Sequence, residues 1–177
     1  MVAFAKTATI RAKDSVPLGQ AGYMQKRMDY LDYIAAAPRP SVVVLEDLDD
    51  LVGYGAFWGE VQSNVHQALG CLGTITNGSV RDIPMIAPGF QMLAGSIAPS
   101  HAYVHVVEFG IDVTVHGMTV LDGTLIHADR HGAVIVPVDK IDAMKRANDK
   151  LSAQEARIIG AARSGGGVAA IKAALRG

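Results

Sequence analysis

The spacing of hydrophobic and polar residues predicts alternating strands and helices in the first half of the chain. Alternation and β-branched runs indicate strands, whereas an apolar stripe at helical spacing indicates a helix. Pro38 and Pro40 end the first helix, and Gly70 favours the end of the second. The predicted elements are the strand Phe4–Ile10, the helix Tyr23–Ala37, the strand Val42–Leu45, the helix Gly59–Leu69 and the strand Thr74–Thr76.

The second half is mostly strand until two helical stretches, Asp139–Ala162 and Val168–Leu175, near the C-terminus. Its short apolar runs, separated by glycines, predict the strands Tyr103–Phe109, Val113–Val115, Met118–Leu121, Thr124–His127 and Ala133–Val136. Interleaved elements early and strands later favour a layered α/β domain over a pure Rossmann alternation. We expect one domain over residues 1–177, with C-terminal helices over about 138–177.

Composition narrows the function classes. The chain has 177 residues, of which 50% are hydrophobic, and a net charge of -1 gives no general attraction to nucleic acid or acidic lipid. The single cysteine, Cys71, excludes an internal disulfide and a multi-thiolate zinc site, and we expect it to be buried and inert. No signal peptide or membrane-spanning apolar run is evident. We therefore expect a cytoplasmic protein that binds neither nucleic acid nor membrane.

The most informative residues lie at the start of the second predicted helix and after the next strand. Backbone amides of Gly59–Gln62 would be unpaired at a helix N-terminus and could bind a carboxylate or phosphate. Arg81 could clamp an acid or stabilise an oxyanion, and Asp82 offers a hard oxygen ligand to a divalent cation. Alternatively, Arg81 and Asp82 form a surface pair, and Glu60 only complements the helix dipole.

Five histidines in the strand-rich half raise the question of a transition-metal site. They are His101, His105, His116, His127 and His131. On one strand, His101 and His105 would share a face but lie about 13 Å apart, which is too far for one metal. His-x-His and His-Glu-x-x-His do not occur. We expect these histidines to be hydrogen-bonded structural or interface residues.

Other reactive residues give weaker signals. Lys6 could form a Schiff base with a keto acid, but a solvated lysine at a sheet edge is the simpler interpretation. Trp58 and Tyr54 precede the second helix and either wall a pocket or form a hydrophobic staple. No Gly-x-Ser-x-Gly, phosphate-loop or dinucleotide-binding motif occurs.

One spacing resembles a known family. Glu60 is followed by twenty residues and then by Arg81-Asp82, which is similar to the acid-x20-Arg-Asp pattern of aldolases in the RraA-like family. That family contains 4-hydroxy-4-methyl-2-oxoglutarate/4-carboxy-4-hydroxy-2-oxoadipate aldolases and the regulator of ribonuclease E. The resemblance extends from about Phe4 to Glu155 and includes Ala68-x-Gly70, Gly73, Asn77-Gly78-Ser79-Val80, Gly117-Met118-x-Val120 and Ala128-Asp129-x-x-Gly132-Ala133-Val134-Ile135-Val136-Pro137.

The resemblance implies a swivelling β/β/α-type α/β fold, short at its N-terminus, that assembles as a homotrimer or hexamer. It also implies a class II pyruvate aldolase that uses Mg²⁺ or Mn²⁺, often with oxaloacetate decarboxylase activity. Asp82 would bind the metal directly, and Glu60 would hold metal-bound waters, as would Glu155 from a neighbouring subunit. Arg81 would contact the keto-acid oxygen. The substrate carboxylate would lie on the amides of Gly59, Glu60, Val61 and Gln62.

Four features depart from the family pattern. Val61-Gln62 replaces an apolar pair and could change substrate preference. Asp122-Gly123-Thr124 replaces a Pro-Gly-Asp turn, and the segment 127–131 replaces an acidic run. Because the first predicted strand lies near Phe4, we expect this chain to lack the family's N-terminal segment, which can contribute acids to a neighbouring site. That difference leaves the proton-transfer half of an aldol reaction open.

The resulting hypothesis is a metal-dependent lyase that cleaves a 4-hydroxy-2-keto diacid to pyruvate. Arg81 and the metal would stabilise charge on the carbonyl oxygen, and a water near Glu60 would transfer the proton. One alternative is a non-catalytic binding protein like the ribonuclease E regulator, although regulators of that type lack the complete motif. A class I lyase acting through Lys6 is a third hypothesis.

Overall fold

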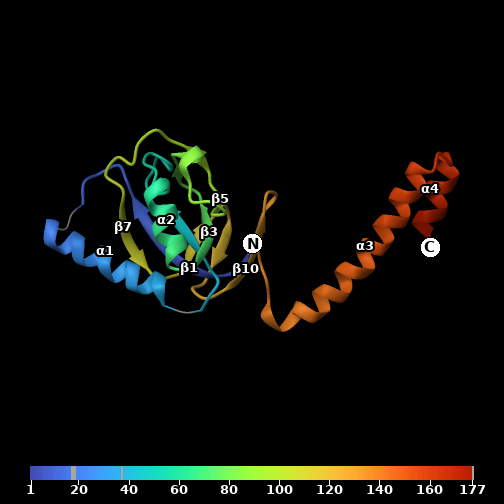
Figure 1. The fold of residues 1–177 in the computed structure, drawn as a ribbon, viewed down its shortest axis with the longest axis horizontal. Coiled ribbons are helices and arrows are strands. Elements are labelled where there is room, and N and C mark those ends of the chain that lie inside the picture. The colour runs from blue at the N-terminus through green and yellow to red at the C-terminus, as the bar shows by residue number, and fades with distance from the viewer. Residues whose placement is uncertain (17–18, 37, 177) are drawn as a thin grey trace. The chain divides into compact units, whose positions relative to one another are not determined.

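The computed structural model describes residues 1–16, 19–36 and 38–176, which form two compact units (Figure 1). The first unit, Met1–Val136, contains a mixed sheet, and the second, Pro137–Gly177, is helical. The division falls close to residue 138, where the sequence places the start of the C-terminal helices. That the two units act as a single domain stays a prediction.

Strand β1 (Val2–Arg11) lies inside the main sheet. It pairs in parallel with β2 (Ser41–Asp47), and its other edge pairs antiparallel with β10 and β7. The order of the sheet is β11-β10-β1-β2-β3-β5, with β7 also on β1. The other strands are β3 (Cys71–Thr76), β5 (Gln91–Leu93), β7 (His105–Phe109), β10 (Leu125–Asp129) and β11 (Gly132–Ile135).

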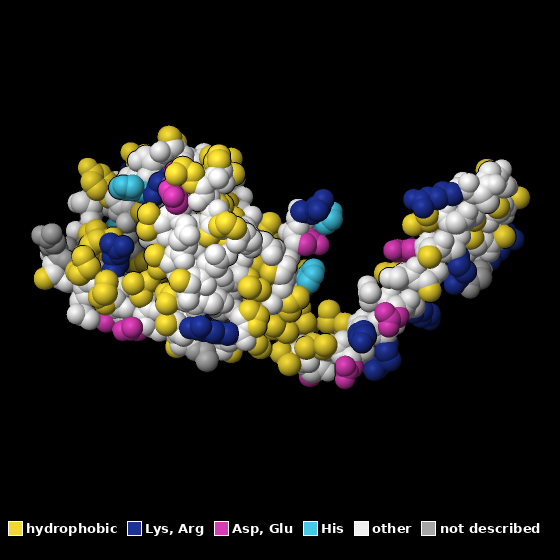
Figure 2. All heavy atoms as spheres, viewed as in Figure 1, with side chains coloured by type: hydrophobic (Ala, Val, Ile, Leu, Met, Phe, Trp, Pro, Cys, Tyr) yellow, Lys and Arg dark blue, Asp and Glu magenta, His cyan; other side chains and the backbone are white. Residues whose placement is uncertain are grey.

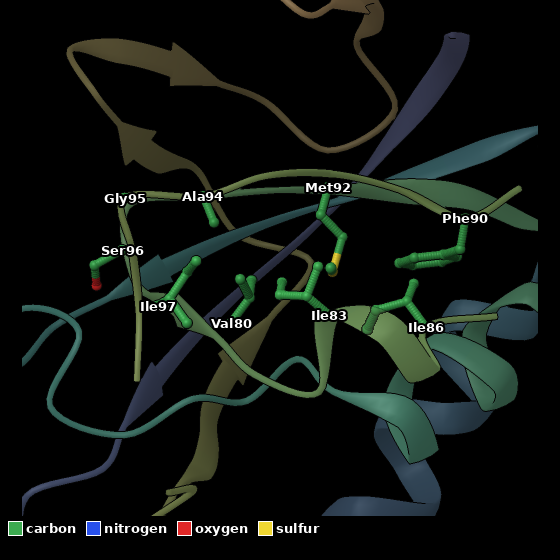
Figure 3. A pocket seen from close by; sticks show the side chains of 9 residues that line it. All are labelled: Val80, Ile83, Ile86, Phe90, Met92, Ala94, Gly95, Ser96 and Ile97. Carbon is green, nitrogen blue, oxygen red and sulfur yellow. The ribbon is translucent and has the colours of Figure 1, made fainter. Parts of the chain in front are cut away.

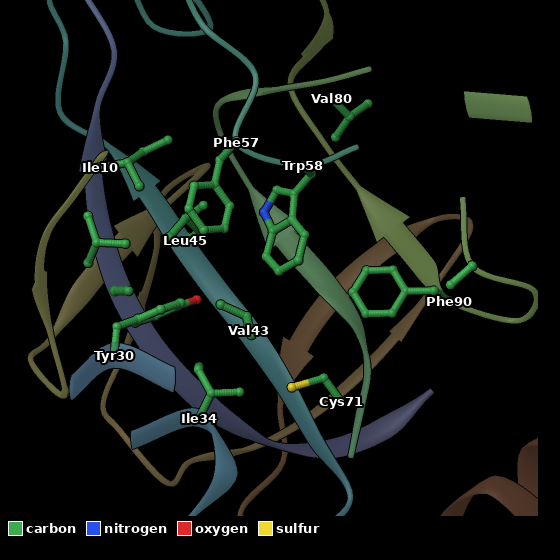
Figure 4. Close-up of a cluster of buried hydrophobic side chains, with 13 residues drawn as sticks. Ile10, Tyr30, Ile34, Val43, Leu45, Phe57, Trp58, Cys71, Val80 and Phe90 are labelled. Atoms are coloured by element: carbon green, nitrogen blue, oxygen red, sulfur yellow. The ribbon is translucent and has the colours of Figure 1, made fainter. Parts of the chain in front are cut away.

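Each face of this sheet has its own layer and its own core. Val43 and Leu45 of β2 pack on the side of α1 (Gln20–Ala35) and α2 (Glu60–Ala68), which lie on one face (Figures 1 and 4). Val42 and Val44 point the other way, toward the hairpin of β8 (Val113–Val115) and β9 (Met118–Val120). A continuous β-branched run therefore forms a strand buried on both sides. These layers confirm the predicted α/β fold of β/β/α type.

Four short elements escaped sequence prediction. They are β4 (Ser79–Val80), the 3-10 helix η1 (Ile83–Met85), β5 (Gln91–Leu93) and β6 (Ser96–Ile97). β4 pairs with β6, and Val80 also forms a β-bridge with Trp58. Two or three residues cannot establish a hydrophobic period, so only long-range pairing defines such elements. The first helix ends in the structure at Ala35, and Ala37, its predicted last residue, lies outside the described residues.

The second unit consists of η2 (Val138–Lys140), α3 (Ile141–Arg163) and α4 (Gly167–Arg176). Both C-terminal helices are therefore confirmed. Charged side chains of both signs lie along α3 with apolar ones between them (Figure 2). Among the described residues, no helix is both long and apolar enough to cross a membrane.

The solvated position expected for Lys6 is wrong. The side chain is 5% exposed, and its Nζ lies 4.6 Å from the centroid of the Tyr33 ring. The reason is topological, because β7 and β10, which come much later in the chain, cover the second edge of β1. A cation–π contact thus replaces part of the hydration of the ammonium group. Cys71 is buried as predicted, and its burial raises the pKa of its thiol.

A buried polar contact joins the two helices of the first unit. The His66 Nε2 atom lies 2.9 Å from the Tyr30 hydroxyl, and its Nδ1 lies 2.7 Å from the Gln62 carbonyl oxygen. Since a carbonyl only accepts, Nδ1–H donates to Gln62, and neutral Nε2 accepts from Tyr30. Burial lowers the pKa of His66 to about 4. Trp58 and Phe57 pack against the imidazole.

Titration of His66 should therefore make the first unit less stable in mild acid. Its folded-state pKa lies below the ordinary value near 6.5, so the unfolded chain binds the proton more readily, and stability falls as the pH drops from 6.5 toward 4. We expect the free energy of unfolding to fall by about 2 kcal/mol between pH 7 and pH 5 from this residue. Urea denaturation at both pH values measures the change.

His66→Gln removes the titration but keeps an amide that can bond to Tyr30. The variant should lose stability at pH 7 yet show a smaller difference between pH 7 and pH 5 than the wild type. An exposed control, His127→Gln, should keep the wild-type difference. An equal pH difference in wild type and His66→Gln would contradict this account.

Candidate active site

Two segments far apart in sequence meet at the start of α2. The Arg81 amide donates a hydrogen bond to the Trp58 carbonyl oxygen at 2.9 Å, next to the bridge between Trp58 and Val80. This pairing brings the Gly59 backbone against the side chains of Arg81 and Asp82. A Cβ at Gly59 would lie 2.6 Å from Asp82 Oδ2 and 3.0 Å from Arg81 Cγ. Only glycine leaves room for that approach.

Asp82 caps helix α2 from a distant part of the chain. The helix has no capping side chain of its own, because its N-cap residue is Gly59. The Glu60 amide instead donates to Asp82 Oδ2 at 3.3 Å, so this carboxylate satisfies one of the unpaired first-turn amides. Asp82 itself has a left-handed backbone with φ of 56°. A non-glycine residue in that region indicates local strain, which is commonly stored at functional sites.

Arg81 adds a fixed positive charge at the same point. Its Nη1 donates to Asp82 Oδ2, and the two side chains are 25% and 29% exposed. The Arg81 Nε is buried and has no partner among the described atoms. A buried donor without an acceptor is costly, and an anion in the site would supply one. The pair is therefore partly buried against a helix terminus.

Hydrogen bonds from the next segment hold α2 in place. Ser63 Oγ donates to the Glu60 carbonyl at 2.8 Å and accepts from the Ala87 amide at 3.0 Å. Gln67 Nε2 donates to the Pro88 carbonyl at 2.9 Å. Because residues 87–88 follow η1, which starts just after Asp82, these bonds fix the helix relative to the acid.

The structure brings the six predicted site residues of the first unit together around this point. Gly59, Glu60, Arg81 and Asp82 form the contacts described above. Val61 and Gln62 belong to the same first turn of α2, where the Val61 side chain is 60% exposed and that of Gln62 is half-buried. Glu155 lies exposed on α3, in the second unit. Its role from a neighbouring subunit stays a prediction.

The histidines occupy separate positions. His101 lies in a loop, because Ala102 adopts a left-handed conformation and β7 begins only at His105. The prediction that His101 and His105 share one face of a strand is therefore wrong. His116 Nε2 lies 3.2 Å from the Thr76 carbonyl, and exposed His131 pairs with Asp129. Over the described part of the chain, no three His, Cys, Asp or Glu side chains gather as a complete metal-binding set.

Besides an open hollow of about 460 Å³ that Arg81 and Asp82 themselves line, two cavities border the site. One, of about 700 Å³, is apolar and lined by residues on both sides of the Arg81–Asp82 pair, including Val80, Ile83 and Phe90 (Figure 3). Its lining side chains carry no charge. The other, of about 470 Å³, includes Arg81 and Gln62 together with Arg27 of α1. Sequence reasoning missed Arg27, and the available signal was its helical spacing from Tyr23 and Tyr30.

Comparison with known proteins places the chain in a family. The RraA-like family model, described as Aldolase/RraA, matches residues 4–135. The chain belongs to the RraA-like family. Its matched region contains the whole Gly59–Asp82 arrangement, whereas α3 and α4 lie beyond it.

Similar proteins share this fold. Protein DlpA of Legionella pneumophila is 25% identical over 145 residues, which are 76% of this chain and 22% of DlpA. The chain thus spans about a fifth of that curated relative. Streptomyces coelicolor RraAS2, described as an unusual member of the RNase ES inhibitor RraA family, has a TM-score of 0.64 at 22% identity, covering 87% of this chain and 74% of RraAS2. The RNA-processing inhibitor RraA from Thermus thermophilis has a TM-score of 0.56 at 18% identity, with coverages of 77% and 75%.

Gly59→Ala should disturb the site without straining its own backbone. Residue 59 has an extended φ of −166°, which alanine adopts freely, so the effect comes from pushing Asp82 away from the Glu60 amide. We expect a loss of about 0.5–1.5 kcal/mol in the free energy of unfolding and a changed NMR shift of the Glu60 amide. Gly19→Ala, where a Cβ meets nothing within 4 Å, is the control. Unchanged Glu60 and Asp82 signals in Gly59→Ala would refute the close contact.

Proposed function

We propose that this protein is a divalent-metal-dependent class II pyruvate aldolase, or lyase, that cleaves a 4-hydroxy-2-keto diacid to pyruvate. The observation that carries the proposal is the contact of Arg81 and Asp82 with the N-terminus of α2. It combines a cation, backbone donors and an acid in one partly buried place. Membership of the Aldolase/RraA family supports the same chemistry. Decarboxylation of oxaloacetate is expected from the same site, because it also leaves a pyruvate enolate.

The residues present suit Mg²⁺ or Mn²⁺. Mg²⁺ is usually held by one or two carboxylates together with waters and substrate oxygens, so a full cage of protein ligands is not required. Asp82 would bind the metal directly, and exposed Glu60 would hold its waters. When bound, the metal would act as a Lewis acid toward the keto acid. The Arg81–Asp82 contact would have to loosen for this, which is possible because Arg81 has further donors.

Arg81 and the helix terminus would orient the substrate. The amides of Gly59–Gln62 would receive the substrate carboxylate, aided by the positive end of the helix dipole. Arg81 would donate to the carbonyl oxygen on which negative charge develops, and such preorganised donors contribute several kcal/mol in a partly dry site. Glu60 would position the water that transfers the proton.

We also propose that the active form is a homotrimer or hexamer with sites at subunit boundaries. In such an assembly, Glu155 of a neighbouring subunit would reach the metal-bound waters. The exposed apolar residues Leu151 and Ile159 on the same helix favour a partner for α3.

The purified protein should release pyruvate from 4-hydroxy-4-methyl-2-oxoglutarate and from oxaloacetate, as followed with a coupled dehydrogenase. EDTA should abolish the release, and Mg²⁺ or Mn²⁺ should restore it. Asp82→Asn removes the metal ligand, and Arg81→Ala removes the oxyanion donor, so each should lower kcat/KM at least about 10²-fold. Asp112→Asn, an exposed acid outside the site, should remain active. Normal turnover in Asp82→Asn or Arg81→Ala would refute the proposal.

A second candidate is an RNase-inhibiting protein, because two neighbours with this fold carry that description. The complete acid-x20-Arg-Asp pattern of Glu60, Arg81 and Asp82 supports catalysis instead. We expect a molar excess of the protein to leave RNA cleavage by a ribonuclease of the E type unchanged, as measured by gel electrophoresis of the products. Inhibition that persists in Asp82→Asn, combined with no pyruvate release, would establish the inhibitor function.

A further inference from the structure

The cavity of about 470 Å³ beside the candidate site is built mainly from α1, the first turns of α2 and the segment before β7. Tyr23, Arg27 and Tyr30 of α1 follow each other at spacings of four and three residues, so they share one helix face. That face lies toward Val61 and Gln62 at the start of α2. The volume falls in the range of about 300–1,000 Å³ that small-molecule pockets occupy. The cavity therefore extends the candidate site toward α1.

The charged side chains that line the cavity are all basic. Its lining contains Arg27, Arg81 and two histidines, but no aspartate or glutamate. Among the residues that the structure describes, no acidic side chain forms an ion pair with Arg27. Arginine stays charged at any working pH. A pocket with two such cations and no lining carboxylate attracts an anion with more than one negative charge.

The two histidines are less suited than Arg27 to bind a carboxylate. His101 Nδ1 lies 2.7 Å from the Ala102 carbonyl, and His105 Nδ1 lies 2.8 Å from the Tyr103 carbonyl. Each Nδ1–H is thus used by the backbone and is not available to a carboxylate. Arg27 and Arg81 are the two lining side chains whose positive charge does not depend on pH.

We propose that this cavity is the subsite for the far carboxylate of a 2-keto diacid and that Arg27 binds that carboxylate. The inference rests on the proposed function for the placement of the keto-acid end at Arg81 and the α2 amides. Arg27 then determines specificity, because it distinguishes a diacid from a monoacid of equal length. Gln62 also lines the cavity, so its amide is available to the polar middle of the substrate.

A pair of ligands that differ only in the far carboxylate tests the proposal. 2-Oxoglutarate and 2-oxopentanoate have the same chain length, and neither can be cleaved as an aldol. Isothermal titration calorimetry with Mg²⁺ should show that the wild-type protein binds 2-oxoglutarate at least about tenfold more tightly than 2-oxopentanoate, since the far carboxylate forms a charge-assisted hydrogen bond with Arg27. Arg27→Gln should abolish this preference and leave the affinity for 2-oxopentanoate unchanged.

Lys26→Gln is the matched control. It removes the same charge from the neighbouring position of α1, which does not line the cavity, and it should keep the preference for 2-oxoglutarate. The inference is overturned if the wild-type protein binds both acids equally or binds neither. It is also overturned if Arg27→Gln retains the preference or if Lys26→Gln loses it equally.

Failure of the proposed function gives a different result. If no pyruvate is released from any aldol substrate but 2-oxoglutarate still binds through Arg27, the diacid subsite stands and the lyase reaction does not. If pyruvate is released while Arg27→Gln changes neither binding nor the KM for 4-hydroxy-4-methyl-2-oxoglutarate, the lyase stands and the subsite does not.

Discussion

The close approach of the Gly59 backbone to Arg81 and Asp82 is the constraint on which the site depends. It exists because Trp58 pairs with Val80 as a parallel bridge and accepts a hydrogen bond from the Arg81 amide. Trp58 is fully buried, so the segment before α2 cannot move outward without exposing a large aromatic side chain. Packing of an indole thus positions an acid and a guanidinium at a helix terminus, and glycine is the residue that permits the contact.

The other end of α2 is held by a different kind of interaction. His66 is fully buried, and its two ring nitrogens bond to Gln62 and Tyr30, so α2 is tied to α1 through satisfied polar groups. Aromatic side chains therefore pack around His66 near the C-terminal end of α2, whereas the first turn of the helix is polar. Such a rigid support matters because a catalytic donor contributes only if it is already in place when charge develops.

Sequence patterns were reliable where periodicity is local and unreliable where pairing is long-range. The buried strand at Val42–Leu45 and the helix at Gly59–Leu69 follow from periods that a short window contains. The burial of Lys6 does not follow from a local pattern. Whether β1 is an edge strand depends on β7 and β10, which lie about a hundred residues further along the sequence. The loop at His101 depends on one left-handed residue, Ala102, whose identity gives no turn signal. The Glu60 and Arg81-Asp82 spacing indicated the site, but the capping of α2 by Asp82 required coordinates.

The arrangement of charge also explains why one arginine at the site would be insufficient for selectivity. Arg81 has five N–H donors. Nη1 donates to Asp82, and the buried Nε has no partner among the residues that the structure describes. In the proposed lyase this group would recognise the keto-acid end that all substrates share, so it would not distinguish one substrate from another. Discrimination would need a second charge in the cavity, and in the proposed subsite a monoacid would leave Arg27 without a partner. An analogue that lacks the charged group leaves the protein's own buried polar group without a partner, which is costly. An apolar pocket loses much less when a substrate lacks one methylene, so a charged pair discriminates more strongly.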